Sequence, residues 1–586
     1  MTKKWINRGE LNNGQVIADA KAYKITPEFA AILYKRGLDY NDLVSPSPSV
    51  APSGLLKDME KGVDIVYEGI KAGRKFCVVN DYDVDGITSG TIMDEAIRIS
   101  GGESFVFTPS RVIDGYGISK RIVEVAVLRG AEIIVTTDNG IAATEAISFA
   151  KEQGITVVIT DHHEVPKAED GCDFLPPADA IIDPKQQECN YPFKDICGAE
   201  VALKFAVLLL AKANVEKTVS SKSLRRFTEM AAIGTVCDVM PLVKENRALV
   251  KAGLELLSKS QIVGLRQLMK QKAIDTDNLS AYSIGFGIGP CINSMSRMND
   301  DTETPLKLLS EKDYLKADSI AKAMVKVNDN RQKDQEYAKE EALRILNESG
   351  SNNIDIIYIE NGNPALMGIV AGKIKDITGH PTVCVTDDAE GILKGSGRST
   401  DNYNMFEMFS LHKNLYEKFG GHAGAIGISF KKDNLRDIVK LLNEDAKDYT
   451  FVPEIIVDLF LPMSDVKEPF VKDLELLEPI GHGNPEVVLC DDHSLLTGLR
   501  YIGKDKQYLK FCFDNNGKTT EAVYFGDNKT FLDYLTSTFG ETPVEELFQT
   551  PCTTRVPLSI LYSPSINVWN GNTSISFKIS DYQIRT

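Results

Sequence analysis

Aspartates follow three apolar runs in the N-terminal part of the chain, at the point where each run ends. The runs are residues 76–80, 133–137 and 155–160, and the residues that follow them are Asp81, Asp138 and Asp161. A stretch of helical character, such as 142–153, separates successive runs, which is the pattern of strands in a parallel sheet. Because the carboxyl ends of parallel strands lie along one edge of the sheet, we expect these carboxylates to converge in one crevice.

The residues around these aspartates are typical metal ligands. Asp83 and Asp85 follow Asp81 at alternate positions, and His162 and His163 follow Asp161 directly. A single aspartate after a strand is usually a turn former or a helix cap. The chain has only 7 histidines, however, so an adjacent pair at such a position is hard to attribute to chance. The sequence therefore predicts a metal site at the sheet edge.

The segment 81–86 allows two other interpretations. Its aspartate spacing and its Gly86 are those of a calcium-binding loop, but the twelfth position is Ile92 where a glutamate is required, and a strand rather than a helix precedes it. The calcium interpretation therefore fails. The segment also resembles the aspartyl-phosphate loop of haloacid-dehalogenase-type phosphatases, although Ile87 stands where that loop has threonine. We keep this as a minor alternative.

Composition limits the class of protein. A chain of 586 residues divides into about three or four domains. Its 10 cysteines occur singly, which is typical of a reducing cytoplasm. The N-terminus has no apolar leader and the strongest apolar stretch, 205–210, is too short for a bilayer, so we expect no membrane partner. The net charge of −17 by itself argues against a nucleic-acid binder, but a locally basic groove is compatible with it and would favour single strands over long duplex contacts.

The pattern along the chain predicts five parts. Residues 1–54 read as a helical lead-in, 55–315 as an α/β domain, 316–348 as a long polar helix without glycine or proline, 349–454 as a second α/β domain, and 455–586 as a domain of alternating strands. Asn515-Asn-Gly517 and Asn570-Gly571 are hairpin signals in the last part. A small β-barrel is expected there.

Together these motifs resemble those of a known family. The segment 81–86, Asp138, Asp161-His162-His163 and the segment 234–242 with Asp238 are similar to the four successive motifs of the DHH phosphoesterases, and in detail to the RecJ-type single-strand exonucleases. The resemblance covers nearly the whole chain, and its further segments are 109–111, 114–117, 286–297, 394–399, 419–423, 477–486 and 569–571.

The resemblance implies a fold and an activity. It makes 55–315 a parallel-sheet DHH catalytic domain, 349–454 a DHH-associated substrate-binding domain joined by the long helix, and 455–586 an OB-fold nucleic-acid-binding domain. The implied activity is two-metal-dependent 5′-to-3′ hydrolysis of single-stranded DNA to 5′-mononucleotides in repair and recombination. Two rivals stay open: a DHH enzyme for short oligonucleotides or cyclic dinucleotides, and a non-catalytic replication scaffold.

By motif matching, the site residues receive roles. Carboxylates with one imidazole suit Mn²⁺ or Mg²⁺, and more than four ligands imply two ions. The metal ligands are Asp81, Asp83, Asp85, Asp138, His162 and Asp238, with Asp83 and Asp85 on separate ions and Asp138 between them. Asp161 is expected to orient an imidazole, and His163 to face the substrate phosphate.

The resemblance also implies how the substrate is held. Arg111, Ser396 and Arg398 match a pocket for the terminal 5′-phosphate, and the further substrate contacts are Tyr116, Asn293, Arg297 and His422. Three positions depart from the family pattern: Cys291, where arginine is usual, Ser296 and Asn363. We expect a cytoplasmic monomer, with a single-strand-binding protein or a helicase as candidate partners.

Overall fold

The computed structural model describes residues 3–45, 50–388, 391–515, 518–569 and 572–585. The chain forms two compact units. The first consists of Met1–Pro46, Val452–Glu478 and Pro485–Thr586, and the second of Ser47–Phe451 and Pro479–Asn484. Each unit is built from segments that are far apart in the sequence.

The larger unit begins with a five-stranded sheet in which every pairing is parallel. Its strands, in spatial order, are β3 (Glu103–Phe107), β2 (Lys75–Asn80), β4 (Ile133–Thr137), β5 (Thr156–Thr160) and β6 (Ala180–Ile182). The chain leaves β2 in one direction to form β3 and returns on the other side to form β4. This order creates a switch point between β2 and β4, where ligand crevices form in open α/β sheets. The predicted parallel sheet is confirmed.

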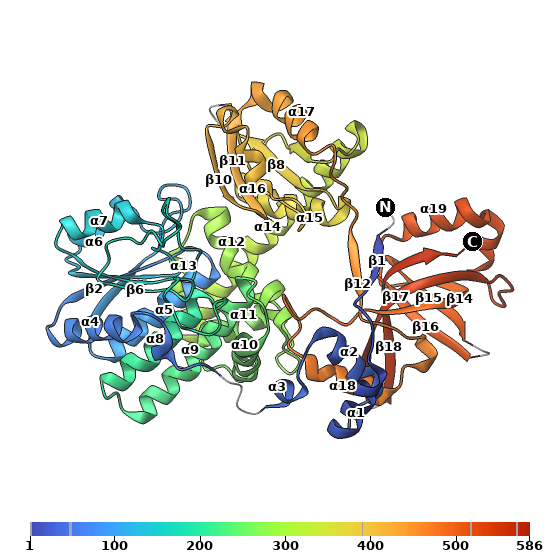
Figure 1. Cartoon of the computed structure of the whole chain (residues 1–586), viewed down its shortest axis with the longest axis horizontal. Helices are drawn as coiled ribbons and strands as arrows, with labels where there is room; N and C mark the ends of the chain where they lie inside the picture. The colour runs from blue at the N-terminus through green and yellow to red at the C-terminus, as the bar shows by residue number, and fades with distance from the viewer. Residues whose placement is uncertain (1–2, 46–49, 389–390, 516–517, 570–571, 586) are drawn as a thin grey trace. The chain divides into compact units, whose positions relative to one another are not determined.

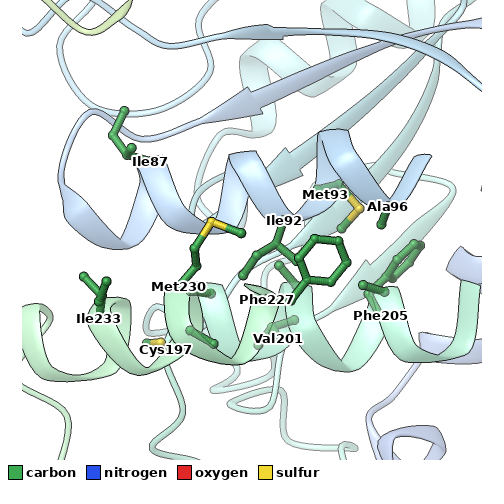
Figure 2. Close-up of a cluster of buried hydrophobic side chains, with 14 of the residues drawn as sticks. Ile87, Ile92, Met93, Ala96, Cys197, Val201, Phe205, Phe227, Met230 and Ile233 are labelled. Atoms are coloured by element: carbon green, nitrogen blue, oxygen red, sulfur yellow. The ribbon is translucent and has the colours of Figure 1, made fainter. Parts of the chain in front are cut away.

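Helices cover both faces of this sheet (Figure 1). The helices on one face are α4 (Met59–Lys71), α5 (Val84–Ile99), α8 (Gly198–Lys212) and α9 (Lys217–Cys237), and those on the other are α6 (Lys120–Leu128) and α7 (Thr144–Glu152). Side chains alternate along each strand, so Phe76 and Val78 enter the first core while Cys77 and Val79 enter the second. Figure 2 shows the first core, where Ile92 of α5 meets Phe227 of α9.

A long helix links this domain to a second sheet in the same unit. The helix α14 (Tyr314–Ser349) contributes Met324 to the first core and Ala342 to the next one. The second sheet has the order β10 (Lys418–His422), β11 (Ala425–Lys431), β9 (Ile392–Arg398), β8 (Thr382–Asp387) and β7 (Asp355–Tyr358), and only β7 and β8 are parallel. Helix α15 (Met367–Thr378) packs on β8 and β9. The predicted connecting helix and second α/β domain are confirmed.

The smaller unit contains a closed barrel of five strands. They are β14 (Leu489–Ile502), β15 (Tyr508–Asn515), β16 (Lys518–Tyr524), β18 (Asn572–Ile584) and β17 (Val556–Trp569). The ring closes because β14 pairs with both β15 and β17. This architecture confirms the predicted OB-fold. Both predicted hairpins form, although residues 516–517 and 570–571 at their turns lie outside the described residues.

The N-terminal segment belongs to this smaller unit and is not purely helical. It contains the helices α1 (Asn13–Tyr23), α2 (Pro27–Arg36) and α3 (Tyr40–Val44), and it begins with β1 (Lys4–Asn7). This strand, which the sequence did not predict, pairs in parallel with β12 (Glu454–Val457). Trp5 Nε1 also donates to Asp581 Oδ2 at 2.7 Å. The two ends of the chain are thus joined.

A buried carboxylate completes this junction. Asp458 follows β12, and its side chain is only 1% exposed. It forms an ion pair with Arg8 Nε at 2.7 Å, and it accepts hydrogen bonds from Arg36 Nε at 2.9 Å and Arg36 Nη2 at 2.7 Å. Within the described ranges, no helix combines the length and the apolar composition needed to cross a bilayer.

We predict that Asp458→Ala lowers the free energy of unfolding of the smaller unit by about 3–5 kcal/mol, because two guanidinium groups lose their common buried partner. Urea denaturation followed by circular dichroism measures the change. Lys4→Ala is the matched control, since its pair with Glu454 joins side chains that are 64% and 50% exposed and contributes less than about 1 kcal/mol. Equal effects of the two substitutions would contradict the central position of Asp458.

Candidate metal centre and phosphate-binding site

Four aspartates lie in one row at the carboxyl edge of the parallel sheet. The strand register aligns Asn80, Thr137, Thr160 and Ile182 across the sheet, so the residues that follow them are also aligned. Those residues are Asp81, Asp138, Asp161 and Asp183. The first three were predicted to converge, and the structure brings them together.

Asp183 was missed by the sequence reasoning. Burial, with the nearby Asp161 carboxylate, raises its pKa to about 8, and its Oδ2 has no hydrogen-bond partner among the described residues. The sequence does contain a signal for Asp183, because Ala180-Ile-Ile182 is another apolar run that an aspartate follows. The run is only three residues long, which is why it was not recognised as a strand.

Seven side chains at this edge form three overlapping groups with the geometry of a metal site. In each group, one ligand atom from every member lies within 4.8 Å of the others. The groups are Asp81 with Asp83 and Asp138; Asp85 with His162 and Asp238; and Asp138 with His162 and His163. All six predicted metal ligands are therefore in one cluster, and Asp138 belongs to two of its groups.

Helix N-termini hold two of these carboxylates in place. Asp83 caps α5 by accepting from Gly86 N at 3.0 Å. Asp85 accepts from Gly198 N at 2.6 Å and from Ala199 N at 2.9 Å, at the start of α8. The partial positive charge at both helix N-termini stabilises the carboxylates.

The close approach of α8 requires glycine at position 198. A β-carbon there would lie 2.6 Å from the β-carbon of Asp138. Asp138 itself has a φ of 61°, a left-handed conformation that few residues other than glycine adopt. Such strain is common at functional sites.

Asp238 reaches the cluster from the opposite side of the crevice. It caps the C-terminus of α9, as expected from the sequence, and its Oδ2 lies 3.6 Å from His162 Nε2. Gly234, one turn earlier, allows this approach, since a β-carbon there would lie 2.5 Å from Asp85 Oδ1.

The cluster is electrostatically unfavourable by itself. Burial and then the neighbouring carboxylates raise the pKa values of Asp81, Asp138 and Asp238 well above the usual range. Asp81 Oδ1 and Asp238 Oδ2 have no hydrogen-bond partner in the described part of the chain. Buried carboxylate oxygens without donors, next to one imidazole, suit a hard divalent cation such as Mn²⁺ or Mg²⁺.

The two adjacent histidines differ in charge. Burial, with the neighbouring charge of His163, lowers the pKa of His162 to about 4. Its neutral Nε2 lies 3.0 Å from Asp138 Oδ1. Burial also opposes the charge of His163, but contact with Asp161 overrides it and raises the pKa to about 9. At neutral pH, His162 is therefore a neutral imidazole that could bind a metal ion, whereas His163 is an imidazolium.

Asp161 orients His163 rather than His162. Its Oδ1 accepts from His163 Nδ1 at 2.8 Å, and its Oδ2 accepts from Ile141 N at 2.9 Å. These interactions outweigh burial and lower its pKa to about 2. On the outer side, Tyr116 Oη lies 3.0 Å from His163 Nε2 and donates to the carbonyl oxygen of Asp138 at 3.0 Å.

Arg111 is presented by a rigid loop after β3. Its backbone N–H donates to Asp300 Oδ1 at 2.8 Å, and the adjacent Ser110 hydroxyl donates to Asp300 Oδ2 at 2.5 Å. Its guanidinium lies over the ring of Tyr82, 3.8 Å from the centroid. Sequence reasoning identified Arg111 but missed Asp300 and Tyr82, which fix it from distant segments.

Three predicted arginines lie near one another. Burial, with the positive charges of Arg111 and Arg398, lowers the pKa of Arg297 to about 10. None of the three forms an ion pair with a carboxylate within the described residues. We call Arg111, Arg297 and Arg398 the arginine cluster. Unpaired guanidinium groups in an acidic chain favour an anionic ligand.

The second domain holds Arg398 at the end of β9, against the start of α15. A β-carbon at Gly368 would lie 3.0 Å from Arg398 Nη2 and 3.3 Å from the β-carbon of Ser396. Ser396 and Arg398 are thus neighbours on one strand, as predicted. Arg297 Nη1 reaches this domain by donating to the carbonyl oxygen of Ala365 at 3.0 Å.

The remaining predicted positions are more dispersed. Asn293 has a buried Oδ1 without a partner among the described residues, whereas His422 is exposed at the end of β10 and its Nδ1 accepts from Gly424 N at 3.3 Å. Cys291 lies in the apolar core and Ser296 is buried. Asn363 caps a short helix before α15.

We predict that Gly198→Ala weakens Mn²⁺ binding by roughly 10- to 100-fold, the range seen when groups that support metal ligands are disturbed. The added methyl group displaces either α8 or Asp138. Isothermal titration calorimetry measures the affinity. Gly14→Ala, where a β-carbon would meet only an Asn12 side-chain oxygen at 3.4 Å, is the control and should bind Mn²⁺ normally. Unchanged affinity in Gly198→Ala would show that α8 does not set the ligand geometry.

Comparison with protein-family models gives three matches along the chain. Residues 75–235 match the DHH family, N-terminal domain; residues 352–448 match the DHHA1 domain; and residues 457–581 match the RecJ OB domain. The three matches fall on the parallel sheet, the mixed sheet and the barrel, respectively.

Whole-chain relatives agree with these matches. The chain is 31% identical to the single-stranded-DNA-specific exonuclease RecJ of Bacillus subtilis, over 95% of this chain and 68% of that protein. It is 28% identical to the protein of the same name from Escherichia coli, over 90% of each. Its fold is similar to that of RecJ from Thermus thermophilus, with a TM-score of 0.81, 23% identity and coverage of 100% of this chain and 80% of that one. A crystal structure of exonuclease RecJ bound to manganese has a TM-score of 0.58 and 27% identity, over 68% of this chain and 96% of that one. The chain belongs to the RecJ family of single-stranded-DNA-specific exonucleases.

Proposed function

We propose that this protein is a metal-dependent exonuclease that hydrolyses single-stranded DNA from the 5′ end and releases 5′-mononucleotides. One observation carries the proposal: the seven-residue cluster of metal-binding geometry and the arginine cluster belong to the same unit, and Arg111 and Arg297 act electrostatically on residues of the 81–83 segment. A site for cations beside a site for an anion is what cleavage near a terminal phosphate requires.

Two ions fit the ligand groups. Asp83 and Asp85 belong to different groups; Asp138 shares a group with Asp83, and His162 shares one group with Asp138 and another with Asp85. Relatives described with Mn²⁺ and with Mg²⁺ support this choice of metal. When bound, such a pair of ions activates water and neutralises charge on a phosphodiester.

Side chains of this protein control the protonation and the orientation of the two histidines. Asp161 keeps His163 protonated, and Tyr116 fixes the other edge of that imidazolium. A charged donor in this position stabilises the negative charge that develops on the phosphate during in-line attack. His162 stays neutral and offers Nε2 as a ligand.

The arginine cluster gives the proposed polarity. Planar guanidinium groups bind phosphate oxygens through paired hydrogen bonds. Arg111 and Arg398, with Ser396, would hold a terminal 5′-phosphate. Arg297 lies near both of these arginines, since the positive charge of each lowers its pKa. We assign Asn293 and His422 to contacts farther along the strand.

The smaller unit supplies a barrel of the type that binds single strands. A single-strand-binding protein or a helicase as partner, a monomeric state and a cytoplasmic location stay predictions. Two rival activities are less well supported. A non-catalytic scaffold has no need for six converging metal ligands, and an enzyme for short or cyclic oligonucleotides has no need for a barrel domain.

We predict that Asp138→Ala lowers Mn²⁺-dependent hydrolysis by about 10³-fold or more, as expected when a site that acts as a unit is dismantled. The assay digests end-labelled single- and double-stranded DNA with Mn²⁺, Mg²⁺ or a chelator. Wild-type protein should degrade only the single strand, and only with metal. Circular dichroism shows whether the variant is folded. Near-normal turnover of the variant at saturating Mn²⁺ would remove Asp138 from the centre.

We predict that Arg398→Ala reduces the preference for 5′-phosphate over 5′-hydroxyl ends by roughly 10- to 100-fold, because a charge-assisted contact with phosphate contributes about 1.5–3 kcal/mol. The comparison uses KM for oligonucleotides labelled at the 3′ end. Lys373→Ala removes a positive charge from an exposed pair with Glu336 in the same domain and should leave the preference intact. If the wild-type protein shortens products from the 3′ end, the proposed polarity is wrong.

A further inference from the structure

Two aromatic rings lie stacked and exposed at the surface of the larger unit. Tyr282 and Phe286 are 69% and 66% exposed, and their ring centroids are 4.5 Å apart with an interplanar angle of 21°. Aromatic side chains normally bury most of their surface, because burial removes apolar area from water. Two aromatic rings that are stacked and exposed to solvent can bind a ligand through their ring faces. We call these two residues the aromatic stack.

The stack stands on a rigid element. Residues Ser283–Ile288 form a π-helix (η2), a rare conformation that is frequent at functional sites. Its Ile284 and Ile288 are fully buried in the first core. The two rings are therefore fixed in position by the opposite face of the same turn.

This element lies beside the metal ligand Asp238. A β-carbon at Gly285 would lie 3.5 Å from Val236 Cγ1, and one at Gly289 would lie 2.4 Å from Cys237 Sγ. Val236 and Cys237 are the residues that precede Asp238 at the end of α9. The helix η2 thus packs on the end of α9 that delivers a carboxylate to the cluster.

The same element runs directly into the phosphate-binding side of the site. Helix α12 (Gly289–Asn299) follows η2 without a break and carries Asn293 and Arg297. Phe286 of the stack precedes Arg297 by 11 positions, a rise of about 16 Å along a helix. That distance corresponds to roughly five stacked nucleotides.

We propose that the aromatic stack is a nucleobase platform, on which bases of the single strand stack while the arginine cluster holds its terminal phosphate. The proposal rests on the proposed exonuclease function and deepens it, since it adds a contact with bases to a site otherwise made of contacts with phosphate. Every base has a π-face, so such a platform is tolerant of sequence. It also favours single strands, because the bases of a duplex are already stacked on their neighbours.

The surroundings of the stack favour a nucleic acid over a protein as its occupant. The residues of η2 beside the rings are Ser283, Gly285 and Gly287. They provide no broad apolar surface of the kind that marks protein docking sites. The largest exposed apolar side chain at the adjacent end of α9 is Val239, so two stacked rings next to the proposed metal ligands are suited to individual bases.

The test compares KM for two single strands, one with normal bases and one with abasic residues at the positions beyond the first nucleotide. Tyr282→Ala and Phe286→Ala should each raise KM for the normal strand by about 5- to 100-fold, the effect of losing one stacked base. KM for the abasic strand and kcat for both strands should stay unchanged. Tyr282→Phe keeps the ring and should behave as the wild type.

The matched control is Tyr337→Ala, which removes a tyrosine that is 68% exposed on α14. It should leave both KM values unchanged. A loss that is equal on normal and abasic strands would mean that the rings serve only the structure of the site. An unchanged KM of Tyr282→Ala and Phe286→Ala for the normal strand would mean that the stack does not bind bases and that it binds a different partner, such as a protein. Either result overturns the proposal.

A binding measurement separates this proposal from the exonuclease function itself. Phe286→Trp in the Asp138→Ala background places a fluorescent ring in the stack of an inactive protein. Its emission should be quenched by the normal strand and not by the abasic strand. Equal responses to the two strands would refute the platform even if the wild type is active. Absence of Mn²⁺-dependent hydrolysis in the wild type would refute the proposed function independently of the quenching.

Discussion

Repulsion among buried carboxylates is the constraint on which the rest of the catalytic domain depends. Asp81, Asp138 and Asp238 are held in one crevice although burial and their neighbours raise the pKa of each. A fold tolerates such a cluster only where other forces position the chain and where cations neutralise the charge. The apolar cores on both faces of the sheet provide the first condition. The second condition, neutralisation by cations, is met by the donor set, because carboxylate oxygens and imidazole are suitable ligands for divalent cations.

The backbone contributes as much to this site as the side chains. The strand register places Asp81, Asp138 and Asp161 in one row, and the N-terminus of α8 donates two N–H groups to Asp85. Gly198 is required because a side chain there would collide with Asp138. The order of the strands then puts the row at a topological switch point, where the crevice is open. The carboxylates can lie close together because the strand register, the N-terminus of α8 and the absence of a side chain at Gly198 bring their backbone segments together.

Local patterns predicted much of this structure, and contacts between distant segments explain what was missed. An apolar run followed by aspartate was sufficient to identify Asp81, Asp138 and Asp161, because each strand and its aspartate are adjacent in the sequence. Asp183 escaped because its strand has only three residues. The strand β1 escaped because its partner lies some 450 residues away, and no local pattern encodes that pairing. The roles of individual residues, taken from resemblance, stay predictions until they are tested.

The division of the larger unit around α14 bears on how the substrate is recognised. Arg111 and Arg297 come from the first domain and Arg398 from the second, so a phosphate held by all three also joins the two domains. Among the described residues, the apolar clusters at the two ends of α14 are separate, and that helix contributes residues to both. Like charges repel across this junction, since burial and the neighbouring arginines lower the pKa of Arg297, and the proposed phosphate would neutralise that charge. On the proposed function, a terminal phosphate would thus contribute to the geometry that cleaves the strand, and substrate binding would be linked to the assembly of the site.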